Sequence, residues 1–218
     1  MIGADTGPDR VVADRVHRLE RNFFGKYRGL VVDNADPLKL GRLKLRVPSL
    51  LGDQVVTGWA TPCVPYGGAD NQGMVMIPEV GAGAWVEFEE GDLEFPIWVG
   101  TYWSKPSGTT ELPKPNGDDA AEAGEVQDPP TRKIIKTLKG HTIQLEDKDG
   151  EEAILIVEGK HQHFVLMNQD GITIQDAAGN SLVMTSSAVT LTAKAQLTID
   201  ASGQALVLKA STIDFKKA

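Results

Sequence analysis

The sequence predicts an all-β protein built from two regions of different strand character. Gly, Pro, Asn and Asp recur at short intervals through residues 24–105 and divide them into short strands, as in a small barrel or sandwich. From residue 134 onward, apolar residues recur in pairs two positions apart, with turn residues between the pairs. This second pattern is typical of a repeat array such as a β-helix or solenoid.

Charge and cysteine content exclude several classes of protein. The 218-residue chain has a net charge of −8, which argues against a nucleic-acid binder because phosphate contacts need a basic face. Its one cysteine, Cys63, forms no internal disulfide, and we expect it to be a small buried residue. No apolar run approaches the roughly 18 residues of a membrane helix, and the N-terminus lacks the apolar core of a signal peptide. We therefore expect synthesis and assembly in the cytoplasm of the producing cell.

Residues 1–23 form an N-terminal segment with one predicted helix. Within residues 11–22, Val12, Val16 and Leu19 recur at helical spacing, and Asp9 is placed to cap the start. So short a helix is not stable alone in water. We expect it to dock on its own domain or on a partner.

The strands of residues 24–105 show clear sidedness. The stretch "WVEFEE" alternates apolar Val86 and Phe88 with outward residues, so one side faces a core. In "GRLKLR", Arg42, Lys44 and Arg46 share one face, which we interpret as solvated.

This region holds four tryptophans, three of which cluster within nineteen residues near its end. Stacking on nucleic-acid bases is one role for such a cluster, but no basic groove accompanies these rings. We expect core packing instead for Trp59, Trp85, Trp98 and Trp103.

Residues 106–133 are predicted to be an acidic, proline-rich linker. They hold hardly any large apolar side chains, so this segment cannot bury enough surface to fold alone.

Residues 134–218 supply eight apolar pairs, each a minimal strand of period two. The candidate core residues are Ile143, Leu145, Ile154, Ile156, Ile172, Ile174, Leu182, Met184, Val189, Leu191, Leu197, Ile199, Leu206, Leu208, Ile213 and Phe215.

The turns between these pairs are too short for one chain to enclose a core. Three chains wound together solve this, because each forms one side of a triangular prism and the pairs meet on the axis. Such winding also gives every strand partners and removes exposed edges. We predict an obligate homotrimer whose C-terminal region is unfolded as a monomer.

Three stretches carry a family resemblance: "YRGLVVDNADPLKLGRLKLRVPSL", "WATPCVPYGG" and "IPEVGAGAWVEFEEGDLEFPIWVGTYW". Together they resemble the OB-fold domain of contractile-tail spike proteins. That family comprises phage baseplate assembly protein V, the VgrG spikes of type VI secretion and the spikes of extracellular contractile injection systems. The later runs "GHTIQLEDKDGEEAILI" and "DGITIQDAAGNSLVMTSSAVTLTA" are similar to the β-helical needle of the same proteins.

This resemblance implies a fold and a role. It implies an OB-fold over residues 24–105 and a trimeric, intertwined triangular β-helix, the needle, over residues 134–218. The spike would sit on a baseplate hub protein through its N-terminal and OB end, and sheath contraction would drive it into a target cell envelope. A separate PAAR-type protein would cap the blunt end after "STIDFKKA".

The resemblance also indicates which kind of contractile system contains the spike. VgrG proteins carry a large hub portion before the OB fold, whereas here only about 23 residues precede it. We therefore favour a virion tail or a released extracellular injection particle, with a VgrG-like type VI spike as the alternative.

His161 and His163 are the candidate metal ligands. At strand spacing both rings point the same way, and six imidazoles of a trimer would suit an octahedral ion such as iron on the axis. If Val165 and Met167 point inward, the histidines do too. If Phe164 and Leu166 point inward, the histidines face solvent. We favour solvent-facing histidines at a turn, and therefore no metal or other cofactor.

We expect no catalytic residues. Some family spikes carry a lysozyme domain where this chain has only its acidic linker, and no folded carboxylate pair is available for glycoside cleavage. The acidic residues Asp147, Asp149, Asp170 and Asp176 fall in predicted turns, where they would bond nearby backbone. A glycan-degrading spike and an OB-fold nucleic-acid binder remain the alternatives to a mechanical spike.

Overall fold

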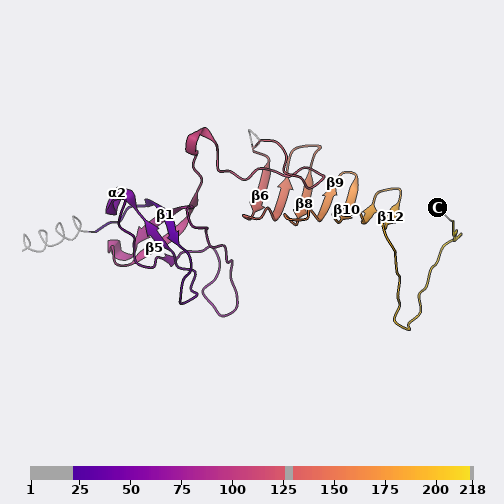
Figure 1. The fold of residues 1–218 in the computed structure, drawn as a ribbon, viewed down its shortest axis with the longest axis horizontal. Coiled ribbons are helices and arrows are strands. Elements are labelled where there is room, and N and C mark those ends of the chain that lie inside the picture. The colour runs from indigo at the N-terminus through magenta and orange to yellow at the C-terminus, as the bar shows by residue number, and fades with distance from the viewer. Residues whose placement is uncertain (1–21, 126–129, 217–218) are drawn as a thin grey trace, which may run out of the picture. The chain divides into compact units, whose positions relative to one another are not determined.

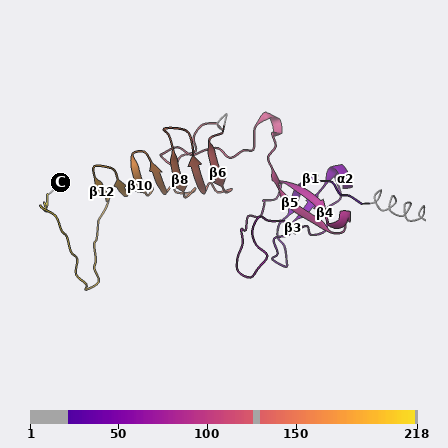
Figure 2. The ribbon, with the colours of Figure 1, turned by 180° about the vertical axis from the view of Figure 1, so that it is seen from behind.

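The computed structural model describes residues 22–125 and 130–216, which form two compact units divided after Glu111 (Figures 1 and 2). The predicted helix at residues 11–22 lies almost wholly outside the described residues, so its docking stays a prediction. No helix in the described part of the chain is long and apolar enough to cross a membrane.

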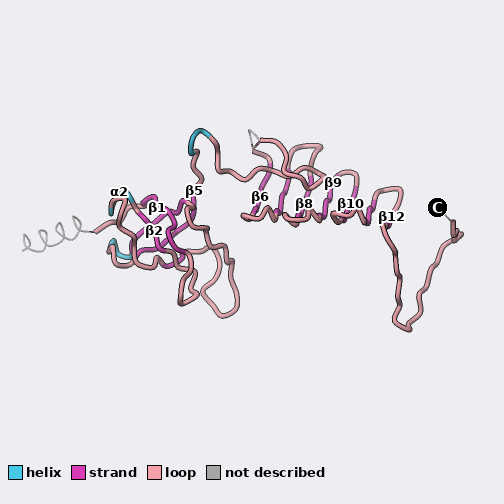
Figure 3. Tube along the Cα trace, viewed as in Figure 1, coloured by secondary structure: helices cyan, strands magenta, loops and turns pink. Residues whose placement is uncertain are grey.

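The N-terminal unit is a five-stranded sheet in the order β2-β1-β4-β5-β3, antiparallel except where β3 meets β5. Its elements are β1 (Tyr27–Asp33), β2 (Lys44–Arg46), α2 (Pro48–Leu51), β3 (Thr61–Pro62), β4 (Gly83–Phe88), η1 (Glu89–Gly91), β5 (Pro96–Tyr102) and η2 (Pro106–Gly108). Figure 3 shows how much of this unit is loop.

The sheet curls because its two edges meet. An isolated antiparallel bridge joins Leu43, just before β2, to Ala60, just before β3. The predicted alternation of β4 is confirmed, since Ala84, Val86 and Phe88 are buried and their neighbours are half-buried. The core residues of the unit are Val31, Leu43, Leu45, Val47, Ala60, Ala84, Val86, Phe88 and Trp98.

Two expectations for this unit were wrong. Of the four tryptophans only Trp98 is in the core, whereas Trp103 is 64% exposed. Cys63 is also exposed rather than buried. Trp103 and Cys63 each come directly after the end of a strand, β5 and β3, where the pattern of alternating burial has ended and residue type alone is a poor guide to burial.

The loop between β1 and β2 is organised around Asp36. Its carboxylate accepts hydrogen bonds from the backbone N–H groups of Leu38 and Leu40, at 3.0 and 2.8 Å. It also accepts bonds from the Arg42 side chain, from Nε at 3.1 Å and from Nη2 at 2.7 Å. This side-on pair fixes the start of β2 and the direction of the Arg42 side chain.

The C-terminal unit is a seven-stranded antiparallel meander, in which each strand pairs with the next along the chain. Its strands are β6 (Arg132–Lys136), β7 (Thr142–Glu146), β8 (Ala153–Val157), β9 (Phe164–Asn168), β10 (Gly171–Gln175), β11 (Ser181–Met184) and β12 (Val189–Thr192). The prediction of a mostly β fold is confirmed. Within a single chain the array is a sheet, because a triangular prism needs three copies.

Part of the expected linker belongs to this second unit. Residues 112–125, which we name the cover segment, lie beyond the division between the units and contact β6 to β9. No helix or strand occurs within these described residues, and their contacts hold them on the sheet, while their inability to fold alone stays a prediction.

Candidate trimerisation face

One side of the C-terminal sheet carries two ladders of apolar side chains. Ile143 in β7 lies opposite Ile156 in β8, and Ile156 lies opposite Val165 in β9. Directly paired residues project to the same side of a sheet, so the ladder continues from strand to strand. We call this side the open face.

The two ladders of the open face run nearly the whole length of the meander. The first consists of Ile135, Ile143, Ile156, Val165, Ile174, Leu182 and Leu191, and the second of Leu145, Ile154, Met167, Ile172, Met184 and Val189.

The open face remains uncovered in the single chain. Its residues in β7, β8 and β10 are 36–45% exposed, and Val189 in β12 is 72% exposed. A hollow of about 770 Å³ lies against it, lined by Ile156, Ile174 and Leu182 among others. Contiguous apolar surface on this scale is rare on monomeric proteins and marks an interaction site.

The opposite side of the sheet is covered by the chain itself. Leu155 and Val157 in β8 and Phe164 and Leu166 in β9 are at most 7% exposed, and they form a cluster with Ala120 of the cover segment. β8 and β9 are apolar on both faces, so each needs a second layer. The cover segment provides that layer without using the open face.

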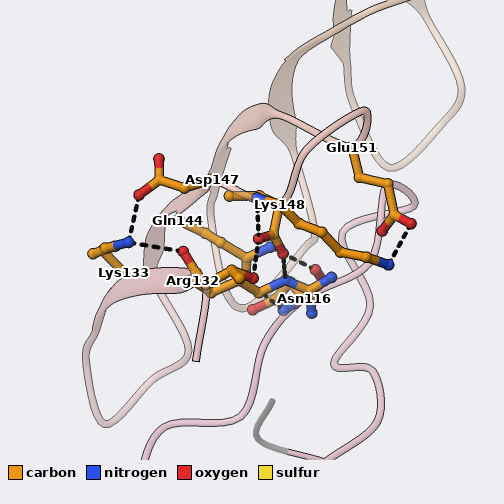
Figure 4. Close-up of polar contacts among 9 residues, drawn as sticks. Asn116, Arg132, Lys133, Gln144, Asp147, Lys148 and Glu151 are labelled. Atoms are coloured by element: carbon orange, nitrogen blue, oxygen red, sulfur yellow. Dashed lines mark hydrogen bonds and ion pairs between the residues drawn. The ribbon is translucent and has the colours of Figure 1, made fainter. Parts of the chain in front are cut away.

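Polar contacts hold the cover segment in place (Figure 4). The backbone N–H of Asn116 donates to Gln144 Oε1, and Gln144 Nε2 donates back to the Asn116 carbonyl, both at 2.9 Å. Thr142 Oγ1 donates to Asn116 Oδ1 at 3.2 Å. All three residues are buried, so these satisfied bonds fix the register between segment and sheet.

Further contacts anchor the first strands. The Lys136 ammonium donates to the Glu122 carboxylate at 2.8 Å and to the Lys114 carbonyl at 3.0 Å. Arg132 Nε donates to the buried carboxylate of Glu146, next to the exposed ion pairs drawn in Figure 4. The exposed pairs Lys133–Asp147 and Lys148–Glu151 add little stability, because water screens them.

Beyond β9 the outer side changes character. Thr173, Gln175, Thr190 and Thr192 occupy that side of β10 and β12, where no buried core residue occurs among the described residues. The open face stays apolar through the same strands. The outer side is thus either covered by the cover segment or mainly polar, with Val183 of β11 among its threonines, whereas the open face is apolar and uncovered.

Family models match both units. Residues 27–103 match the type VI secretion system/phage-baseplate injector OB domain, and residues 133–198 match the phage baseplate V C-terminal trimerisation domain. The chain belongs to the phage baseplate V family. A search of curated proteins gives no match. As a member of this family, the chain is a component of a phage baseplate or secretion apparatus and forms homotrimers through its C-terminal domain.

The structure places the predicted trimer-core residues in two groups. Ten of them lie on the open face, in β7, β8, β10, β11 and β12. The other six, Leu197, Ile199, Leu206, Leu208, Ile213 and Phe215, follow β12, in a stretch where no strand occurs up to residue 216. These six are 49–91% exposed in the single chain, and their role in a trimer core stays a prediction.

Three residues of the open face were missing from the predicted core. Ile135, Val165 and Met167 occupy ladder positions in β6 and β9. The sequence of β9, "FVLMN", is apolar at four successive positions, so it does not show which of its residues share a face. The pairing of Val165 with Ile156 resolves which side of β9 joins the ladders.

Strand parity does not set the direction of His161 and His163, because both lie before β9 begins at Phe164. Gln162 between them has a φ of 62°, so strand alternation stops there. His163 Nδ1 accepts a hydrogen bond from the Ala177 N–H at 3.0 Å, and His161 Nδ1 lies 3.2 Å from the Glu158 carboxylate.

These histidines form a group with Glu158 whose ligand atoms lie within 4.8 Å of one another. Binding a metal through His163 Nδ1 would break its bond to Ala177. Because that nitrogen accepts, the proton of the neutral ring lies on Nε2, which then cannot ligate either. A metal at this turn stays a hypothesis, and the hydrogen bonds give both rings a structural role.

The four acidic residues predicted to lie in turns do lie between strands. Asp176 accepts backbone bonds from Ala178 and Asn180, both at 2.9 Å. The side-chain bond from Asn180 helps hold the pKa of Asp176 below its ordinary value. Asp176 therefore closes its turn as expected, whereas the Asp147 carboxylate pairs with Lys133.

Proposed function

We propose that the homotrimer is the central spike of a contractile injection machine, and that it pierces the target cell envelope when the sheath contracts. The observation that carries this proposal is the open face, whose first ladder runs without a break from β6 to β12 and whose second runs from β7 to β12. Three such faces brought together would bury their apolar side chains on one axis.

The proposed action is mechanical rather than catalytic. A shaft that transmits force needs strands hydrogen-bonded along its length and an apolar core without voids. The meander supplies the first within each chain, and the ladders would supply the second between chains. The outer side, covered first by the cover segment and lined further along mainly by threonines, would present little apolar surface while the shaft passes through the envelope.

The proposal includes two partners. A baseplate hub protein would hold the N-terminal and OB end, and a PAAR-type tip protein would cap the C-terminal end. The 91% exposure of Phe215 and the 49% exposure of Ile213 support the second partner, because such residues need cover. Assembly would take place in the producer cytoplasm, within a phage tail or a released extracellular injection particle.

Electron cryomicroscopy of contractile particles from the producing cells tests this role. We expect threefold density for this chain on the particle axis below the hub, with the C-terminal strands pointing away from the tube. Particles that carry the chain at their periphery would contradict a central spike. Purified trimer should leave a peptidoglycan gel uncleared, whereas clearing would restore the glycan-degrading alternative.

A further inference from the structure

The outer side of the N-terminal sheet is basic and aromatic, although the whole chain is acidic. Basic residues therefore do accompany Trp59 and Trp85, contrary to the expectation from the sequence. β1 pairs Arg28 with Trp85 of β4 and Leu30 with Arg46 of β2. These residues project opposite to the core residues Val31, Leu45 and Val86. We call this side the basic face; its members are Lys26, Arg28, Leu30, Arg42, Lys44, Arg46, Trp59, Trp85, Glu87 and Tyr102.

Two cation–aromatic groups build the basic face. The Arg28 guanidinium lies 5.5 Å from the Trp85 ring centre and 5.4 Å from that of Tyr102. The Trp85 and Tyr102 rings are themselves 5.2 Å apart. Such contacts hold a cation in place while leaving its charge unneutralised.

The second group surrounds Trp59. Lys44 Nζ lies 5.0 Å and the Arg42 guanidinium 5.6 Å from the centre of that ring. Arg42 is held there by Asp36, whose carboxylate is buried in the adjoining loop. Both groups are therefore preorganised, which lowers the entropic cost of binding.

Acidic residues are nearly absent from the basic face. Among its members only Glu87 is acidic, and it pairs with Lys26 at 3.1 Å. Arg28, Lys44 and Arg46 form no ion pair with any residue that the structure describes. Arg46 Nε is buried and has no hydrogen-bond acceptor among those residues. This buried nitrogen is out of reach of a docked carboxylate, so a partner would contact Arg46 at its terminal nitrogens.

We propose that the basic face docks an acidic protein surface, with carboxylates meeting Arg28, Lys44 and Arg46 around Leu30. Leu30 is 39% exposed and lies opposite Arg46, so it offers an apolar contact inside the ring of charge. The occupant is a protein rather than a nucleic acid, because the rings on which bases would stack already carry cations.

This docking does not depend on the piercing role. If the proposed function is correct, the hub is the natural occupant, and only that identification rests on it.

The first experiment uses the purified full-length chain and two labelled probes, poly-L-glutamate and a 20-nucleotide oligothymidylate, followed by fluorescence anisotropy. We expect poly-L-glutamate to bind the wild type more tightly than the oligonucleotide does. Arg28→Gln and Lys44→Gln should each weaken that binding by roughly fivefold, about 1 kcal/mol at RT of 0.59 kcal/mol. Lys105→Gln, an exposed lysine off the basic face, should leave it unchanged. Equal losses at Lys105, or tighter binding of the oligonucleotide, would overturn the proposal.

The second experiment uses intact particles and a carbodiimide, which joins lysine to a carboxylate at zero length. Mass spectrometry should find Lys44 joined to Asp or Glu of a different polypeptide. Lys44 left uncoupled, or joined only to another copy of this chain, would overturn the proposal. Particles without axial density for the chain would contradict the piercing role only. The docking proposal would remain, because the binding of poly-L-glutamate is measured on the purified chain.

Discussion

Ile174 of β10 lies directly opposite Leu182 of β11, and both side chains point to the uncovered side of the sheet. One residue away, Thr173 and Val183 form the matching pair on the outer side. The two faces of one hairpin thus differ in what can cover them. That difference decides where two further copies of the chain can pack.

The cover segment should depend on Asn116. Asn116→Ala removes the side chain that accepts from Thr142 and donates to the Ala120 carbonyl at 2.7 Å. Leaving buried partners unsatisfied costs roughly 1–3 kcal/mol, so the free energy of unfolding should fall by about that amount. Hydrogen exchange should speed up in residues 112–125. Asp118→Ala, an exposed change in the same segment, is the control, and an equal effect there would contradict a role for the buried contacts.

Gly171 should tolerate no side chain. A Cβ at this position would lie 1.9 Å from the Met184 carbonyl oxygen, and its φ of 137° disfavours other residues. Gly171→Ala should therefore destabilise the β10–β11 hairpin by at least about 2 kcal/mol. Gly150→Ala is the matched control, because Gly150 also has positive φ but nothing lies within 4 Å. If the two variants lower the melting temperature equally, the close approach to Met184 does not explain the need for glycine at position 171.

Asp36 should make the N-terminal unit sensitive to acid. The Arg42 guanidinium hydrogen-bonded to Asp36 holds the pKa of that carboxyl well below its ordinary value of 3.8. A lowered pKa stabilises the folded state above pH 3.8, and this contribution is lost as the pH falls further, when the unfolded chain takes up the proton. The stability gap between wild type and Asp36→Asn should thus be constant from pH 7 to about 5 and shrink below pH 4. Urea unfolding followed by tryptophan fluorescence measures it, and a gap independent of pH would contradict this origin.

Asparagine should be able to replace His163 in the turn between β8 and β9. Asn180 Oδ1 accepts from the Lys194 N–H at 2.8 Å, fourteen residues on, as His163 Nδ1 does from the Ala177 N–H. His163→Asn should therefore keep the melting temperature close to that of the wild type. His163→Ala should lower the melting temperature, because losing the hydrogen bond reduces the free energy of unfolding by about 1 kcal/mol. Equal losses in both variants, together with iron found by elemental analysis of the wild type alone, would favour the metal hypothesis.

Much of this architecture could be predicted because it depends on a period of two. Pairs such as Ile143/Leu145 and Ile172/Ile174 show the open face directly, since an alternating strand has one apolar side. The order of turns and strands in residues 24–105 likewise predicted a small barrel or sandwich, and the structure has a curled five-stranded sheet there.

The rest depends on contacts between distant segments. The cover segment has no apolar pattern of its own, and only Leu155 and Val157 hint that β8 needs a second layer. The basic face combines Arg28, Lys44 and Trp85 from three strands, so it appears only when their register is known. His161 and His163 mislead because one residue with positive φ ends the alternation between them.

The central claim is that the open face is buried between three copies of the chain, and one pair of variants tests it most directly. Leu191 and Thr190 are neighbours in β12, both are exposed in the single chain, and they point to opposite sides of the sheet. Light scattering during gel filtration should give the wild type the mass of three 23.5-kDa chains, about 70 kDa. We expect Thr190→Asp to keep that mass and Leu191→Asp to lose it, because an unpaired carboxylate would be buried. A stable, folded wild-type monomer, or a Leu191→Asp chain that remains trimeric, would contradict the account.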